Sequence, residues 1–138
     1  MSVPFRTSRR VEFADTDMAG IVHFANFFRY MEAAEQEFLR SRGLSVALEW
    51  EGRPMGFPRV AAACDYVQPA RFEDVLDVAV GIDRVGVKSV TYVFEFSRQG
   101  QAIANGRVST VCCLVREQKR LEAVEIPAGL RARLLDGL

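Results

Sequence analysis

The chain has 138 residues, 49% of them hydrophobic, which is enough for one good core and hardly for two. Lys and Arg total 18 and Asp and Glu total 18, so there is no bulk attraction to nucleic acid or to anionic membranes. No apolar run approaches the roughly 20 residues of a membrane span, and the N-terminal stretch MSVPFRTSRRVEF lacks the apolar core of a signal peptide. We therefore expect one globular domain over residues 1–138, located in the cytoplasm, that binds neither nucleic acid nor membrane.

The cysteines give no sign of a disulfide framework. There are three of them, an odd number, and Cys112 and Cys113 are neighbours in an apolar, strand-like run. Successive side chains of a strand point to opposite faces, so these two thiols are expected on different sides of the sheet. We predict reduced, structural cysteines.

The first predicted elements are a strand over residues 6–13, RTSRRVEF, and a long helix from Phe24 to Arg42. Apolar residues recur along the helix at helical spacing, with polar residues between them. The apolar positions are Phe24, Phe27, Met31, Ala34 and Phe38, and the polar ones are Arg29, Glu32, Glu35 and Gln36. Gly43 is predicted to end the helix as its C′ residue. Such a helix is about 28 Å long, and its wide apolar stripe indicates that a sheet wraps it.

Four further strands are predicted after the helix, over residues 59–67, 75–83, 87–97 and 102–116. In VLDVAVGID and VKSVTYVFEFS the apolar residues alternate, which is the pattern of a half-buried strand. The connections DRVG and RQGQ are too short for parallel crossovers, so the sheet should be largely antiparallel. Pro127 is predicted to open a C-terminal helix, AGLRARLLDGL. This order of elements indicates an α+β fold.

Four segments carry a family resemblance. They are EFADTDMAGIVHFANFFRYMEAA, ARFEDVL, the dipeptide KS that opens the fourth strand, and RLEAVEIP near the end. On these segments the chain resembles hot-dog-fold thioesterases of the hydroxybenzoyl-CoA thioesterase family over most of its length. The resemblance implies a single hot-dog domain, in which a curved antiparallel sheet of about five strands wraps one long helix. It also implies hydrolysis of an acyl-CoA thioester.

The segment DTDMAG is the first candidate for catalysis. Thioester hydrolysis needs a group that attacks the carbonyl or activates water, and donors for the carbonyl oxygen as negative charge builds on it. From the residues alone, Asp15 and Asp17 are turn and cap residues as readily as catalytic ones. By resemblance, Asp17 matches the catalytic carboxylate, as nucleophile or general base, and the backbone N–H of Phe24 matches the donor that polarises the carbonyl. Asp15 is expected to be structural.

Two further residues belong to this candidate site. Gly20 lies in the loop that would fold the carboxylate back towards the first helical turn, whose N–H groups lack internal partners. His23, the only histidine, either takes part in the chemistry or is a solvated residue. A single histidine leaves no second acid/base pair of the kind a hydratase of this fold would need. A non-catalytic acyl-CoA-binding protein remains the other alternative, because fold alone does not decide function.

The substrate implied by the resemblance is an acyl-CoA or aroyl-CoA ester, so coenzyme A is part of the substrate and no cofactor or metal is expected. Lys88 and Ser89 match the family's nucleotide-contacting segment. Phe27 and Met31 belong to a set of aromatic and methionine residues that could line the acyl pocket or form the core. The set is Phe24, Phe27, Phe28, Met31, Trp50, Met55 and Phe57. Because flat acyl groups pack well against such rings, we favour an aroyl group over an aliphatic one.

Assembly is the last expectation. A sheet of about five strands around one helix leaves long apolar edges, and exposed edges of this kind tend to pair with another chain. Edge-to-edge pairing of two chains would extend the sheet. We therefore expect a homodimer at least and favour a homotetramer, with each site built from two chains.

Overall fold

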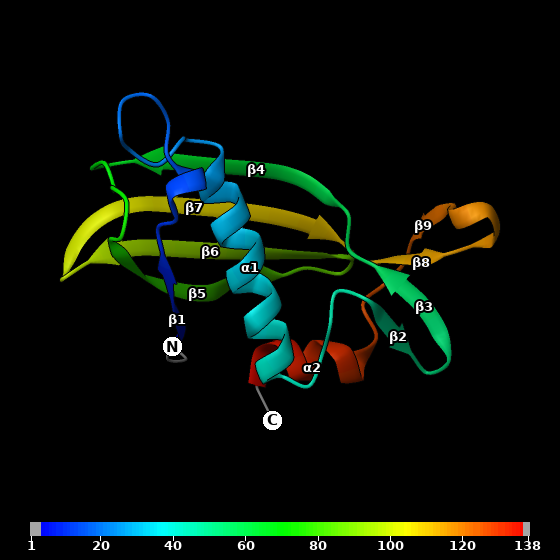
Figure 1. Cartoon of the computed structure of the whole chain (residues 1–138). Coiled ribbons are helices and arrows are strands. Elements are labelled where there is room, and N and C mark those ends of the chain that lie inside the picture. Colours follow the sequence, from blue (N-terminus) through cyan, green and yellow to red (C-terminus); the bar gives the residue numbers. More distant parts are fainter. Residues whose placement is uncertain (1–3, 137–138) are drawn as a thin grey trace.

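A five-stranded antiparallel sheet forms the body of the computed structural model, which describes residues 4–136 (Figure 1). The strands lie in the order β1-β5-β6-β7-β4, and each neighbouring pair is antiparallel. Their bounds are β1 Phe5–Arg10, β4 Arg59–Tyr66, β5 Val75–Val85, β6 Ser89–Arg98 and β7 Gln101–Val111. The predicted antiparallel sheet is confirmed, and it leaves β1 and β4 as its two edges.

The long helix α1, Asn26–Ser41, crosses one face of this sheet (Figure 1). One side of α1 is buried, through Phe27, Tyr30, Met31, Ala34, Glu35, Phe38 and Leu39. This side belongs to the same core as alternate residues of β5 and β6, such as Val78, Phe94 and Phe96. One face of the sheet and one stripe of the helix therefore enclose the core, as the two periodicities predicted.

The helix is shorter than the predicted 24–42 range at both ends. Its start is delayed because residues 24 and 25 form a turn, which the Tyr66 hydroxyl holds against β4 by donating to the Phe24 carbonyl at 3.0 Å. At the other end, Gly43 has a φ of +70°, and its N–H donates to the Arg40 carbonyl at 3.0 Å. A glycine in this conformation is a common C′ residue, so the predicted helix end is confirmed.

A second sheet of four strands, in the order β2-β3-β8-β9, was not predicted. Its strands are β2 Leu48–Trp50, β3 Arg53–Gly56, β8 Cys113–Val115 and β9 Leu121–Ala123. The predicted strand 102–116 breaks at Cys112, whose N–H donates to the Lys88 carbonyl at 2.6 Å and whose carbonyl accepts from Val124 at 2.9 Å. The chain passes from one sheet to the other at this point. Cys112 lies at this break and Cys113 begins β8, so the two neighbours do not share one strand as expected, and both are buried.

The two ends of the chain also differ slightly from the prediction. The first strand stops at Arg10, before the predicted residue 13, and a short 3₁₀ turn, Phe13–Asp15, follows it. The helix α2, Ala128–Asp136, begins directly after Pro127 and buries Leu130 and Leu134. Its predicted last residues, 137 and 138, lie outside the described part. Within residues 4–136, no helix combines the length and the apolar character that crossing a membrane requires.

Candidate active site

The segment between β1 and α1 folds into a small hairpin that presents Asp17. Thr16 and Val22 form an isolated antiparallel bridge, and the Asp17 N–H donates to the Ile21 carbonyl at 2.8 Å. The turn is closed by the Gly20 N–H, which donates to the Asp17 carbonyl at 2.9 Å. Gly20 has a φ of +79°, a conformation that side-chain-bearing residues rarely adopt. The glycine predicted for this loop therefore shapes the turn that carries the carboxylate.

The Asp17 side chain is exposed and only partly hydrogen-bonded. One carboxylate oxygen, Oδ1, accepts a hydrogen bond from the Ala19 N–H at 2.8 Å. Among the described residues, nothing donates to its second oxygen. A carboxylate in this state is oriented by one contact and keeps an oxygen for a ligand or for water.

Asp15 accepts several hydrogen bonds through its side chain and its carbonyl, which fits the structural role expected for it. Its Oδ2 accepts hydrogen bonds from the Tyr30 hydroxyl at 2.8 Å and from the Glu12 N–H at 2.9 Å. Its carbonyl accepts from the His23 N–H at 2.9 Å and from the Asn26 side-chain amide at 2.8 Å. Burial and the hydrogen bond to Asp15 raise the pKa of Tyr30, so the hydroxyl stays a donor. Asp15 thus ties the Asp17 hairpin to the start of α1.

His23 and Phe24 form the turn that leads into α1. Within residues 4–136, the backbone N–H of Phe24 has no acceptor, and its side chain is 63% exposed. The His23 ring stacks on the Phe24 ring with centroids 4.7 Å apart. The Nδ1 atom of His23 accepts a hydrogen bond from the Ala25 N–H at 3.2 Å. Because Nδ1 accepts this bond, a neutral ring carries its proton on Nε2, which can then act as a donor.

Two residues predicted to bind substrate are buried in the core of the single chain. Phe27 is 3% exposed and Met31 is 1% exposed. Phe27 packs edge-on against Tyr66 and Phe96, with ring centroids 5.5 and 5.3 Å apart. Met31 packs on Gly106 of β7, where a β-carbon would collide with its thioether. Both side chains thus belong to the core, and neither is exposed in the single chain.

Ser89 is the first residue of β6 and follows Lys88, and this start of β6 lies at the opposite end of the sheet from the loop between β1 and α1 (Figure 1). Tyr66, next to the Phe24 turn, pairs with Ala104, which in turn pairs with Phe96. Ser89 is seven residues before Phe96 on the same strand, a separation of about 23 Å. A single chain therefore does not bring the two predicted halves of the site together.

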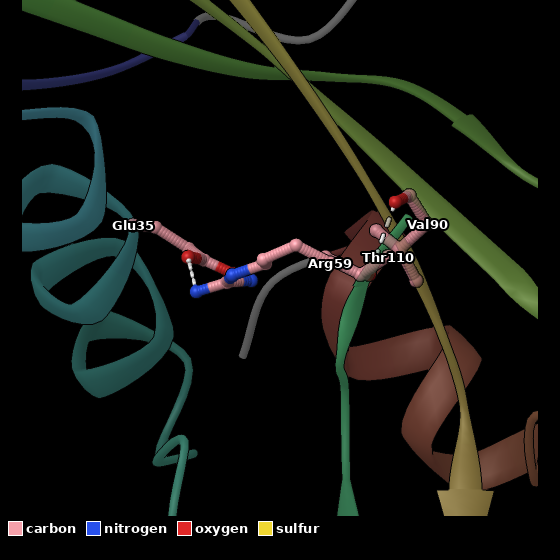
Figure 2. Close-up of polar contacts among 4 residues, drawn as sticks. All are labelled: Glu35, Arg59, Val90 and Thr110. Carbon is pink, nitrogen blue, oxygen red and sulfur yellow. Dashed lines mark hydrogen bonds and ion pairs between the residues drawn. The ribbon is translucent and has the colours of Figure 1, made fainter. Parts of the chain in front are cut away.

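Near this second end, the structure contains a buried ion pair that sequence reasoning missed. Glu35 had been assigned to the polar side of the helix, but it is only 3% exposed. Arg59, the first residue of β4, reaches across to α1 and donates to both Glu35 oxygens, at 2.8 and 2.5 Å (Figure 2). Burial raises the pKa of Glu35, although the Arg59 guanidinium opposes that shift. The buried Thr110 hydroxyl, drawn next to Arg59 in Figure 2, donates to the Val90 carbonyl at 3.1 Å and ties β7 to β6.

The segment that leads into α1 contains the Asp17 carboxylate, with one oxygen lacking a donor, and the Phe24 backbone N–H, which lacks an acceptor. The ring of His23 stacks on the ring of Phe24. No group of three or more metal-ligating side chains converges among residues 4–136. A carboxylate and a free backbone donor at the entry to a helix are the two kinds of group that thioester hydrolysis would need.

Comparison with known proteins identifies the family. The family model described as "Thioesterase-like superfamily" matches residues 11–134, so the chain belongs to that superfamily. It is 30% identical over 129 residues to the 4-hydroxybenzoyl-CoA thioesterase of Pseudomonas sp. (strain CBS-3), covering 87% of this chain and 89% of that protein.

Solved structures agree with this assignment. A crystal structure of a hypothetical protein from Aquifex aeolicus superimposes with a TM-score of 0.85 at 30% identity, covering 95% of this chain and 99% of that one. The crystal structure of a 1,4-dihydroxy-2-naphthoyl-CoA thioesterase from Synechocystis gives 0.83 at 28% identity, with 96% of each chain covered. The predicted family and hot-dog fold are therefore confirmed. The homologues are acyl-CoA thioester hydrolases, as the predicted enzyme class requires.

Proposed function

We propose that the chain, as a single hot-dog domain, hydrolyses an acyl-CoA thioester with Asp17 as its catalytic carboxylate. The observation that carries this proposal is that the segment leading into α1 contains both an Asp17 oxygen and a Phe24 N–H without a partner among the described residues. The named activities of the homologues support the same reaction. The Phe24 N–H polarises the thioester carbonyl, and the exposed His23 ring, stacked on Phe24, lies next to this donor.

Asp17 could act in the reaction either as a nucleophile or as a general base. As a nucleophile, its free oxygen bonds to the acyl carbon, the carbon–sulfur bond breaks, and coenzyme A leaves as the thiolate. Water then cleaves the mixed anhydride and restores the carboxylate. As a general base, Asp17 takes a proton from water while the oxygen of that water adds to the acyl carbon, and the same carbon–sulfur bond breaks. Both routes need the free oxygen and the Phe24 N–H.

We further propose a homodimer joined through β4, with tetramers formed from such dimers. β4 is an edge strand whose side chains are mostly exposed, including Val60 at 62% and Tyr66 at 46%. Antiparallel pairing about a two-fold axis at the middle of β4 sets Arg59 of one chain opposite Tyr66 of the other. Through this pairing the end of the sheet that carries Lys88 and Ser89 approaches the Asp17 hairpin of the second copy.

For the acyl group we propose an aromatic acid rather than a short aliphatic one. The hairpin end of the chain exposes aromatic rings: Phe24 meets Tyr66 edge-on with centroids 6.5 Å apart, and Phe13 meets Phe72 at 5.8 Å. Flat acyl groups gain about 0.5–1.5 kcal/mol from such contacts beyond burial. Relatives named for 4-hydroxybenzoyl-CoA and 1,4-dihydroxy-2-naphthoyl-CoA act on aromatic esters, which supports the same choice.

A direct test is incubation of the purified protein with a panel of acyl-CoA and aroyl-CoA esters and a thiol reagent that reports free coenzyme A. The proposal expects release of the thiol, with kcat/KM for benzoyl-CoA or hydroxybenzoyl-CoA above that for butyryl-CoA and hexanoyl-CoA. Binding without release would identify the non-catalytic alternative. An aliphatic preference of about a hundredfold or more would exclude the aromatic assignment, whereas a preference below about tenfold is within what a single methylene contributes.

A further inference from the structure

The start of α1 has no side-chain cap. Its N-cap residue is Ala25, and no side chain of the described residues caps this helix end by a hydrogen bond. Alanine is a poor residue at this position, because capping side chains normally bind the free N–H groups of the first turn. A capping side chain here would occupy backbone donors close to the Phe24 N–H. The turn that carries this N–H therefore has to be held by other contacts.

Two backbone hydrogen bonds hold the turn on the side of His23. The peptide group that carries the Phe24 N–H also contains the His23 carbonyl, which accepts from the Asn26 N–H at 2.9 Å. The His23 N–H donates to the Asp15 carbonyl, also at 2.9 Å. Both bonds stay within the segment that leads into α1. They shape the turn, but they do not attach it to the sheet.

The attachment to the sheet is made by Tyr66, the last residue of β4. The Phe24 carbonyl accepts from the Phe27 N–H at 3.3 Å and from the Tyr66 hydroxyl at 3.0 Å. A carbonyl has two lone pairs, so it can take both bonds. Within residues 4–136, this hydroxyl makes the only hydrogen bond between residues 23–25 and the five-stranded sheet. The place of Phe24 relative to β4 is consequently set by one side-chain hydroxyl and the aromatic contacts around it.

Tyr66 is held in place by the sheet and by the core. Its backbone pairs with Ala104 of β7, and the N–H of the next residue, Val67, donates to the Ile103 carbonyl at 2.8 Å. Its ring packs edge-on against the buried Phe27 ring, with centroids 5.5 Å apart. Burial raises the pKa of Tyr66, so the hydroxyl keeps its proton and remains a donor near neutral pH. The hydroxyl is therefore a fixed point against which the turn is placed.

Resting on the proposed function, we propose that Tyr66 is a positioning residue of the thioesterase site. Its hydroxyl holds the Phe24 carbonyl and thereby aims the Phe24 N–H at the carbonyl oxygen of the thioester. Tyr66 acts through Phe24 and not on the substrate itself. A donor that stabilises charge in the transition state has to be in place before that charge develops. Loss of the hydroxyl should therefore lower the rate of the chemical step and leave ester binding unchanged.

The kinetic test uses Tyr66→Phe, which keeps the ring and removes the hydroxyl. On the ester of the panel that the wild type hydrolyses fastest, we expect kcat to fall about fivefold to tenfold, the usual effect of one hydrogen bond, with KM within about twofold. Ser41→Ala is the matched control, because the Ser41 hydroxyl donates to the Phe38 carbonyl at 2.6 Å at the other end of the same helix. This control should leave kcat and KM unchanged. An unchanged kcat in Tyr66→Phe overturns the inference and leaves the proposed function standing.

The carbonyl stretching frequency of a bound ester separates positioning from a purely structural role. Benzoyl-CoA with an isotope-labelled carbonyl is bound to Asp17→Asn, which should not hydrolyse it, and the frequency is read by infrared difference spectroscopy. A hydrogen bond from the Phe24 N–H should lower this frequency relative to that of the ester in water. Adding Tyr66→Phe should reduce the shift, and adding Ser41→Ala should not. Equal shifts in all three proteins overturn the inference.

Amide hydrogen exchange tests the positioning without any ester. Tyr66→Phe should speed exchange of the Asn26 and Phe27 N–H groups by about tenfold, because it loosens the turn to whose carbonyls they donate. The Leu44 N–H, which donates to the Leu39 carbonyl at 2.8 Å beyond the far end of α1, should exchange at the wild-type rate. Unchanged exchange at both Asn26 and Phe27 overturns the inference. If the wild type hydrolyses no ester of the panel, the proposed function fails, and this measurement still decides whether Tyr66 holds the turn.

Discussion

The carboxylates near the two ends of β4 differ in their exposure and in their hydrogen bonding. At the Tyr66 end, Asp17 is exposed, and one of its oxygens has no partner among the described residues. At the Arg59 end, Glu35 is buried and both of its oxygens are bonded. An exposed carboxylate is available to a substrate and contributes little to stability, whereas a buried pair is costly to break. Substitutions at the two ends should therefore separate activity from stability.

The largest expected effect is at the exposed end. Asp17→Asn should lower kcat by about 10²–10⁴, since it removes the nucleophile or general base. The free energy of unfolding should change by no more than about 0.5 kcal/mol, because Asp17 is an exposed loop residue. Thiol release from aroyl-CoA esters measures the first quantity, and urea denaturation measures the second.

Asp15 provides the control for this substitution. Asp15→Ala leaves the buried Tyr30 hydroxyl and the Glu12 N–H without their acceptor, so it should lower the free energy of unfolding by about 1–3 kcal/mol. If turnover survives in Asp17→Asn and is lost in a folded Asp15→Ala protein, the assignment of the catalytic carboxylate is wrong.

At the buried end, Arg59→Ala should destabilise the protein by about 3 kcal/mol near neutral pH, since it leaves the Glu35 carboxylate buried and unpaired. This value is at the low end for buried pairs because the Arg59 side chain is 36% exposed. The loss should grow with pH. Burial already raises the pKa of Glu35 in the folded chain, so the folded state holds its proton more tightly than the unfolded state.

The direction of this pH dependence can be tested by measuring the free energy of unfolding at several pH values. The deficit of Arg59→Ala should be smallest below the ordinary pKa of a glutamate, about 4.3, where Glu35 is protonated in both states. Stability should then fall as the pH rises through the raised pKa of the folded state. Urea denaturation between pH 4 and pH 7 measures this slope, and adding Glu35→Gln to the variant should remove it. A slope that persists in the double variant would assign it to another group.

The middle of β4 tests whether the two ends meet in a dimer. Ala62 lies near the proposed two-fold axis, so Ala62→Glu would set two carboxylates against each other across the strand pair. We expect a folded monomer by light scattering and circular dichroism, with turnover at least about tenfold lower because each site loses half of its residues. A monomer with full activity would refute both the dimer and the shared site.

The two ends also differ in how far sequence reasoning could predict them. Alternation in β5 and β6 and the helical spacing of α1 are local patterns, so the fold followed from them. The family motif identified Asp17 and Phe24 as candidates because their geometry lies within one short segment. The burial of Glu35 depends on Arg59, which is 24 residues away and starts a different element. No local pattern carries that information.

The same argument explains what else the local patterns left open. Phe27 and Met31 fit a pocket lining and a core equally well until the sheet is placed against them. The break of the long strand at Cys112 follows from hydrogen bonds to Lys88 and Val124, both distant in sequence from the residues that alternate around it. Periodicity predicts which face of an element is apolar, but it does not tell which partner covers that face.

The smallest expected effect concerns the turn that holds Asp17. Gly20 has a φ of +79° and no atom within 4 Å of the position where a β-carbon would lie, so Gly20→Ala adds backbone strain without a clash. Gly100, in the turn between β6 and β7, has a φ of +83° and the same open surroundings, which makes Gly100→Ala a matched control. Each substitution should cost about 1–2 kcal/mol of stability. Only Gly20→Ala should also lower kcat, by less than about tenfold, because misplacing a catalytic group reduces the rate. Equal kcat values for the two variants would mean that the Gly20 turn does not position Asp17.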